Sequence, residues 1–60
     1  MTVHYLVTIL KNSLTIEAEV DTIYGPDAAA RMAVSAVLET PPYHMADRAS
    51  FAVAKVQAII

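Results

Sequence analysis

The chain has 60 residues, which allow a single domain over residues 1–60, and a domain of this size buries only about 60% of its unfolded surface. It has no cysteine for a disulfide or a thiolate metal site, and its net charge of -2 with four scattered Lys and Arg residues excludes a nucleic-acid footprint. Because 57% of the residues are apolar and 17% are charged, we expect oligomerisation to cover excess apolar surface, and we expect neither a cofactor nor a metal.

The first two predicted elements are strands that form a hairpin. Apolar positions recur with period two from Val3 to Leu10, and a cleaner alternation follows from Leu14 to Thr22. The intervening turn, Lys11-Asn12-Ser13, contains an asparagine, which tolerates the positive φ of tight hairpins. We therefore expect an antiparallel pair with one apolar face and one solvated face.

A helix is predicted from Pro26 to about Glu39. Proline suits the first helical position, and the Pro41-Pro42 pair ends the helix. Helical spacing predicts a buried stripe made of Ala29, Met32, Ala33, Ala36 and Val37. Val34 and Leu38 fall outside this stripe, so we expect them on a leftover apolar face that is available for self-association.

The last element, Ala49–Ile60, fits a strand, and a helix here would give the alternative order ββαα. The strand is favoured because the polar residues would not gather on one side of a helix. Its alanines would face the predicted helix, and Phe51 and Val53 would lie on the opposite face. The predicted fold is therefore α+β, with the order β-β-α-β, a three-stranded sheet in the order 2-1-3, and one helix on one face.

The sheet face away from the helix is predicted to be an interface. It would carry Leu6, Leu10, Phe51 and Val53, and an apolar centre with a polar border is typical of interfaces. The border is an acidic row in which neighbouring side chains are about 7 Å apart, formed by Glu17, Glu19 and Asp21. This row is either a solvated face or a surface for a basic partner or for nucleic-acid mimicry, and a flat row does not converge on a metal.

Two histidines occupy contrasting positions. His4, beside Leu6, is interpreted as an interface histidine or a satisfied surface histidine rather than a catalyst. If a partner buries it, association would depend on pH near about 6 to 7. His44 lies in the segment from Glu39 to Ser50, where it could pair with Asp47 as a base while Tyr43 acts as an acid. No glycine-rich loop accompanies them, so this segment is interpreted as a connector that presents Tyr43 and His44 to a partner.

The β-β-α-β order is similar to half of the duplicated ferredoxin-like modules, and small acidic proteins of this kind are common among phage-encoded accessory proteins. The chain is not similar to the small tautomerases at their catalytic proline, because its second residue is Thr2. Polar residues interrupt every long apolar stretch, so a membrane span is excluded, and the first ten residues lack the basic region of a signal peptide.

We therefore expect a cytoplasmic, non-enzymatic protein–protein interaction module. It would be a homodimer or larger oligomer that binds a larger protein as a regulator, inhibitor or accessory subunit, without binding nucleic acid or membranes. Two alternatives stay open. One is an oligomeric enzyme or ligand-binding protein with a site between subunits that uses Tyr43, His44, Asp47 and Arg48, and the other is a structural virion component.

Overall fold

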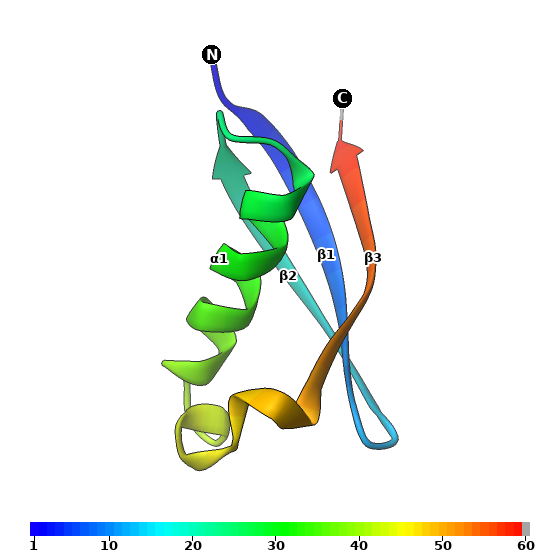
Figure 1. The fold of residues 1–60 in the computed structure, drawn as a ribbon, viewed down its shortest axis with the longest axis vertical. Helices are drawn as coiled ribbons and strands as arrows, with labels where there is room; N and C mark the ends of the chain where they lie inside the picture. Colours follow the sequence, from blue (N-terminus) through cyan, green and yellow to red (C-terminus); the bar gives the residue numbers. More distant parts are fainter. Residues whose placement is uncertain (60) are drawn as a thin grey trace.

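The computed structural model describes residues 1–59 and has the predicted β-β-α-β order (Figure 1). The elements are β1 (Val3–Lys11), β2 (Leu14–Thr22), α1 (Pro26–Leu38) and β3 (Phe51–Ile59), with two short 3-10 turns, η1 (Tyr43–Met45) and η2 (Arg48–Ser50), before β3. The three-stranded sheet has the order β2-β1-β3, and β1 is antiparallel to both neighbours. The predicted α+β fold is confirmed, and the part of the prediction that concerns Ile60 lies outside the described residues.

The hairpin pairs β1 with β2 over their whole length. Lys11 lies opposite Leu14, so the turn contains only Asn12 and Ser13 and is one residue shorter than predicted. Asn12 has φ of 55°, in the left-handed region that asparagine enters more easily than most residues. This register places the apolar side of β1 beside the apolar side of β2, where Ile9 is opposite Ile16.

Helix α1 begins and ends at the predicted signals. Gly25 precedes Pro26 with φ of 92°, and the backbone oxygen of Gly25 accepts the first helical hydrogen bond from the Ala29 N–H at 3.1 Å. At the other end, the Glu39 N–H is shared between the carbonyl oxygens of Ser35 and Ala36, both at 3.2 Å. This tightening of the last turn satisfies carbonyl groups that have no partner further along the helix. Within residues 1–59, no helix is long and apolar enough to cross a membrane.

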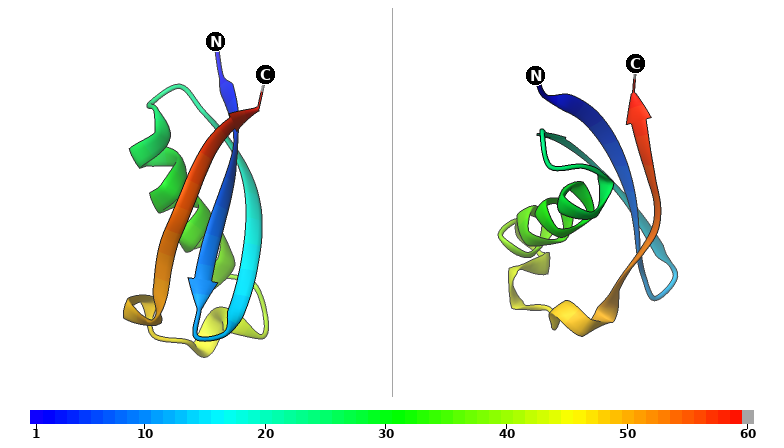
Figure 2. Two further views of the ribbon diagram at one scale, coloured as in Figure 1. Left: turned by 90° about the vertical axis from the view of Figure 1, so that its right-hand side faces the viewer. Right: turned by 45° about the horizontal axis from the view of Figure 1, so that its top comes forward.

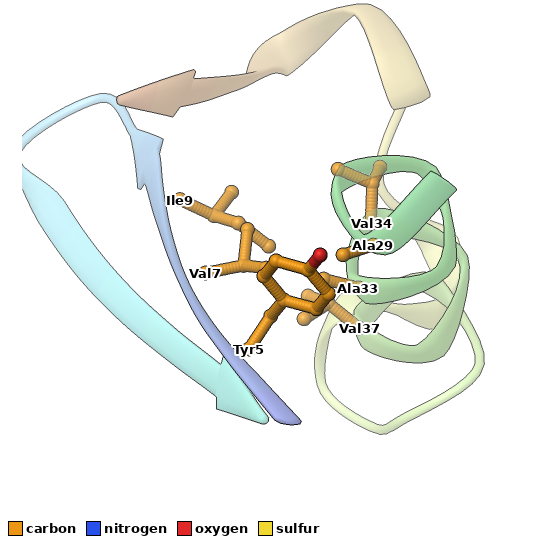
Figure 3. Close-up of a cluster of buried hydrophobic side chains, with 7 residues drawn as sticks. All are labelled: Tyr5, Val7, Ile9, Ala29, Ala33, Val34 and Val37. Carbon is orange, nitrogen blue, oxygen red and sulfur yellow. The ribbon is translucent and has the colours of Figure 1, made fainter. Parts of the chain in front are cut away.

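The core lies between α1 and one face of the sheet (Figures 2 and 3). Its sheet side is the apolar row of β1, and its helix side is rich in alanine, which allows the helix backbone to lie close to the sheet. Four of these side chains have no exposed surface: Val7, Ile9, Ala29 and Ala33. The central strand therefore supplies the largest buried side chains, as expected for a strand with a neighbour on each side.

The buried side of α1 differs from the predicted stripe. Val34 is 7% exposed and belongs to the core, whereas Met32 is 43% exposed and Ala36 is also exposed. The prediction that Val34 lies on a leftover face is therefore wrong. The helix is apolar over most of its circumference, so its own pattern fits more than one rotation, and packing against the sheet decides between them.

The bulge in β3 changes which residues face the helix. Thr8 pairs with Lys55 whereas Ile9 pairs with Val53, so Ala54 is an extra residue without a partner on β1. Before the bulge, the register places Phe51 and Val53 on the helix side, which corrects their predicted position on the open face. Phe51 packs against the core and makes an edge-to-face contact with Tyr43, with 6.2 Å between the ring centroids.

Candidate functional site

No helix of residues 1–59 covers the sheet face away from α1 (Figure 2). Each strand contributes one column of side chains to this face. The columns follow from the register and consist of His4, Leu6, Thr8 and Leu10 on β1, of Thr15, Glu17, Glu19 and Asp21 on β2, and of Ala52, Lys55, Gln57 and Ile59 on β3. Leu6 lies between Glu19 and Gln57. The apolar residues of this face are therefore interleaved with polar ones, and the predicted apolar centre does not form.

His4 lies between two carboxylates of β2. Its Nε2 is 2.6 Å from Glu19 Oε1, and its Nδ1 forms a hydrogen bond with Asp21 Oδ1. The hairpin register explains this arrangement, because His4 is opposite Asp21 and its neighbour Leu6 is opposite Glu19. The hydrogen bonds to Glu19 and Asp21 raise the pKa of His4 above 6.5, although 39% of the side chain is exposed.

The arrangement favours the imidazolium form of His4. A protonated ring donates a hydrogen bond from each nitrogen, whereas a neutral ring has one N–H and would direct its other nitrogen lone pair at a carboxylate oxygen. An imidazolium with two carboxylate partners has no lone pair for a metal ion or for a substrate proton. In the part of the chain that the structure describes, no group of three His, Cys, Asp or Glu side chains is arranged to hold a metal ion.

The His4 ion pairs predict a pH dependence of stability. Because the pKa of His4 is raised on folding, its contribution is fully present below pH 6.5 and is lost as the pH rises through the pKa of the folded state. We expect His4→Gln to destabilise the fold more at pH 5.5 than at pH 8.5, measured by urea unfolding. In an NMR titration, the His4 ring should titrate above 6.5, and the pKa should fall in the double variant Glu19→Gln/Asp21→Asn. A His4 ring that titrates at or below 6.5 would contradict the structure.

The acidic row forms one edge of the open face. Glu17, Glu19 and Asp21 are all exposed, and both ion pairs among residues 1–59 belong to His4. Glu17 takes part in neither, and Thr8 of β1 separates it from Lys55 in the same row of the sheet. The β2 edge therefore carries net negative charge on the side away from the helix.

An apolar hollow lies on the opposite side of the same edge strand. It has a volume of about 210 Å³ and is lined by Ile16 and Ala18 of β2, Ala36 and Val37 of α1, and the following residues Thr40 and Tyr43. The Thr40 hydroxyl donates to the Ala36 carbonyl oxygen at 2.9 Å, so it does not offer its hydrogen to the hollow. This hollow was not predicted from the sequence, where the small size of Ala18 and Ala36 is the signal for it.

The segment between α1 and β3 is held by local contacts. Asp47 accepts a hydrogen bond from the Ala49 N–H at 3.1 Å, and Arg48 Nη1 donates to Ser35 Oγ at 3.4 Å. Tyr43 is half-buried against Phe51, which leaves His44 as the exposed member of the predicted Tyr43/His44 pair. Across residues 1–59, no hydrogen bond or ion pair joins any two of Tyr43, His44, Asp47 and Arg48. Within the single chain, these four side chains therefore form no hydrogen-bonded or ion-paired group among residues 1–59.

The residues predicted for self-association are dispersed by the fold. Val34 is in the core, and Leu38 and Phe51 are half-buried against it. Leu10 and Val53 are each 40% exposed, but the register places them on opposite faces of the sheet. Leu6 is half-buried on the open face, so these six residues do not form one patch.

Both outer strands leave one backbone edge unpaired in the described part of the chain, because β1 is the partner of each. In β3, every residue except Phe51 and Val56 is exposed. Unpaired N–H and C=O groups along an exposed edge are a template for another strand. The two edges differ in charge, since β2 carries three carboxylates and β3 carries a single lysine.

Comparisons of the chain with protein-family models, with curated proteins and with solved structures gave no match. We therefore infer function from the exposed edges, the hollow and the charges of the chain itself.

Proposed function

We propose that the chain is a small non-enzymatic protein–protein interaction module, which works as a homodimer and binds a larger protein as a regulator, inhibitor or accessory subunit. The observation that carries this proposal is the exposed edge of β3. A second copy of the chain is the occupant of that edge, and the β2 edge is left for the larger partner.

The β3 edge has few features that would keep another strand away. Proteins shield exposed edges with charges, prolines and bulges. β3 has one charge, Lys55, no proline, and one bulge at Ala54. After the bulge, the register with β1 is regular from Lys55 to Ile59, where 44% of the Ile59 side chain is exposed. This segment supports antiparallel pairing with the same segment of a second copy.

Charge favours β3 over β2 as the edge for self-pairing. Two β2 strands would bring Glu17, Glu19 and Asp21 close to the same three carboxylates of the second copy, and like charges on paired strands are destabilising. Two β3 strands would bring together only two lysines, and a shift in register can separate these. An isologous β3–β3 contact uses each edge once, so the assembly stops at two subunits.

Sedimentation velocity from about 1 to about 100 μM, a range in which weak interfaces dissociate, tests this proposal. We expect the wild-type chain to form a dimer, and we expect Gln57→Lys to shift it to the 6.5 kDa monomer because the added charge lies on the same edge as Lys55. Thr15→Lys is the matched control, since Thr15 is exposed, lies on the same sheet face and belongs to the other edge strand.

Three outcomes would contradict the proposal. A wild-type chain that stays monomeric at all concentrations would contradict the proposed homodimer. Equal dissociation of the dimer by Gln57→Lys and Thr15→Lys would contradict the assignment of the dimer interface to β3. Open-ended growth instead of a closed dimer would favour a structural assembly protein over a regulator.

A further inference from the structure

We propose that the edge of β2 binds an extended segment of another protein in which basic and apolar residues alternate. This inference rests on the proposed function and specifies the chemistry of the larger partner. It is carried by three features of one strand: an unpaired backbone edge, an apolar hollow on its helix side and carboxylates on its other side.

The backbone of β2 can accept a further strand. It is paired with β1 from Leu14 to Thr22 without a bulge, which keeps it regular over nine residues. In an antiparallel ladder, every second residue of an outer strand directs its N–H and C=O away from its neighbour. An extended segment can therefore add to this edge through main-chain hydrogen bonds, as in other cases of strand addition.

The two sides of β2 differ in chemistry. Ile16 and Ala18 face the helix and line the hollow, whereas Glu17 and Glu19 lie on the other side. Successive side chains of an added strand also point to opposite sides of the sheet. One set of its side chains would therefore meet the hollow and the other set would meet the carboxylates.

The hollow selects an apolar side chain. Its volume is about 210 Å³, and an apolar cavity of about 150 Å³ is enough for a benzene-sized group. Ala36 is exposed at its rim, and Val37 and Ile16 supply apolar walls. A branched aliphatic side chain or a small aromatic one would fill this space and cover the exposed apolar surface.

The carboxylates select basic side chains and exclude a second copy of this chain. Glu17 is exposed and outside both His4 ion pairs, so it is available to a lysine or arginine on an added strand. β3 of a second copy would offer only Lys55, and β2 would offer like charges. The occupant is therefore a segment of a different protein.

A peptide titration followed by NMR tests the inference on the wild-type chain. The probe is the acetylated, amidated peptide KVKVKVK, and the control is KKKKVVV, which has the same charge and composition without the alternation. We expect the alternating peptide to bind at least tenfold more tightly and to shift the amide signals of β2 rather than those of β3. The peptide EVEVEVE should not bind.

Two pairs of variants assign the binding to the two sides of β2. Ala36→Leu fills the hollow and should weaken binding of KVKVKVK at least fivefold, whereas Ala30→Leu, the same change at a half-buried helix position that does not line the hollow, should not. Glu17→Gln should lower the affinity for KVKVKVK. It should also make that affinity less dependent on salt concentration, because one carboxylate is lost. Glu39→Gln removes the same charge from an exposed position outside the sheet and should leave both unchanged.

Four results would overturn the inference. Equal affinity for the two lysine peptides means attraction by charge alone, and shifts confined to β3 mean binding at the other edge. Equal effects of Ala36→Leu and Ala30→Leu exclude the hollow as the binding site. A change in the sedimenting mass caused by Ala36→Leu assigns the hollow to a second copy. A chain that dimerises through β3 but binds KVKVKVK no better than KKKKVVV would leave the proposed function in place.

Discussion

Replacing Ile9 by alanine is expected to unfold a large fraction of the molecule. Ile9 is on the central strand and has no exposed surface. Truncating a buried isoleucine to alanine costs about 2–5 kcal/mol, through lost burial and the cavity that remains. A 60-residue domain has a total stability of only about 3–9 kcal/mol at the usual value per residue. Urea unfolding followed by circular dichroism should show a large fall in the midpoint, or a variant without a cooperative transition.

Leu10→Ala is the matched control for this loss, because Leu10 is the next residue along β1, points to the open face and is 40% exposed. It should cost less than about 1 kcal/mol, in line with substitutions at exposed positions. Ile9→Val, which removes one methyl group, should cost less than Ile9→Ala, at about 0.5–1.5 kcal/mol. Similar losses of unfolding free energy for Ile9→Ala and Leu10→Ala would contradict the location of the core on the side of the sheet that faces the helix.

Replacing Gly25 by alanine is expected to destabilise the fold by about 1–3 kcal/mol. Gly25 has φ of 92° and ψ of -179°, a region of backbone space that is almost confined to glycine. No atom lies within 4 Å of the Cβ that alanine would add, so the cost comes from the backbone conformation and not from a steric clash. Urea unfolding of the wild-type chain and the variant measures the difference.

The stereochemistry of position 25 provides a control that separates conformation from side-chain size. A D-alanine, introduced by chemical synthesis of the chain, has mirror-image backbone preferences and accepts this positive φ without strain. It should stabilise the fold by about 0.4–1 kcal/mol, because it restricts the unfolded chain more than glycine does. Equal destabilisation by the two enantiomers would show that the added methyl group, rather than the backbone angle, causes the loss.

The local signals for the hairpin and the helix were sufficient to place them. The alternation of β2, the turn at Asn12 and the Gly25-Pro26 helix start each act within a few residues, and the structure has the corresponding elements. The contacts of His4 with Glu19 and Asp21 could also have been predicted from the sequence, given the correct turn length. A two-residue turn sets His4 opposite Asp21, whereas the three-residue turn that we predicted does not.

The side of the sheet on which each β3 residue lies could not be predicted from the sequence of β3 alone. Phe51 and Val56 both pack against the core, yet they are five positions apart, and residues separated by an odd number lie on opposite faces of a regular strand. The extra residue Ala54 reverses the alternation between them, so that both reach the helix side. Ala54 is small and apolar, as are Ala52 and Val53 before it, so the sequence contains no local mark of the bulge.

The sequence by itself determined the elements, their order and the face of β1 that is buried, because period, proline, glycine and turn chemistry act locally. Only the tertiary structure decided the rotation of α1, the bulge in β3 and the hollow beside β2. Val34 and Met32 are both apolar, so the packing of the helix on the sheet, and not its own pattern, selects Val34 for the core. The hollow likewise depends on how Tyr43 and Ala36 lie against β2, which are contacts between residues far apart in the chain.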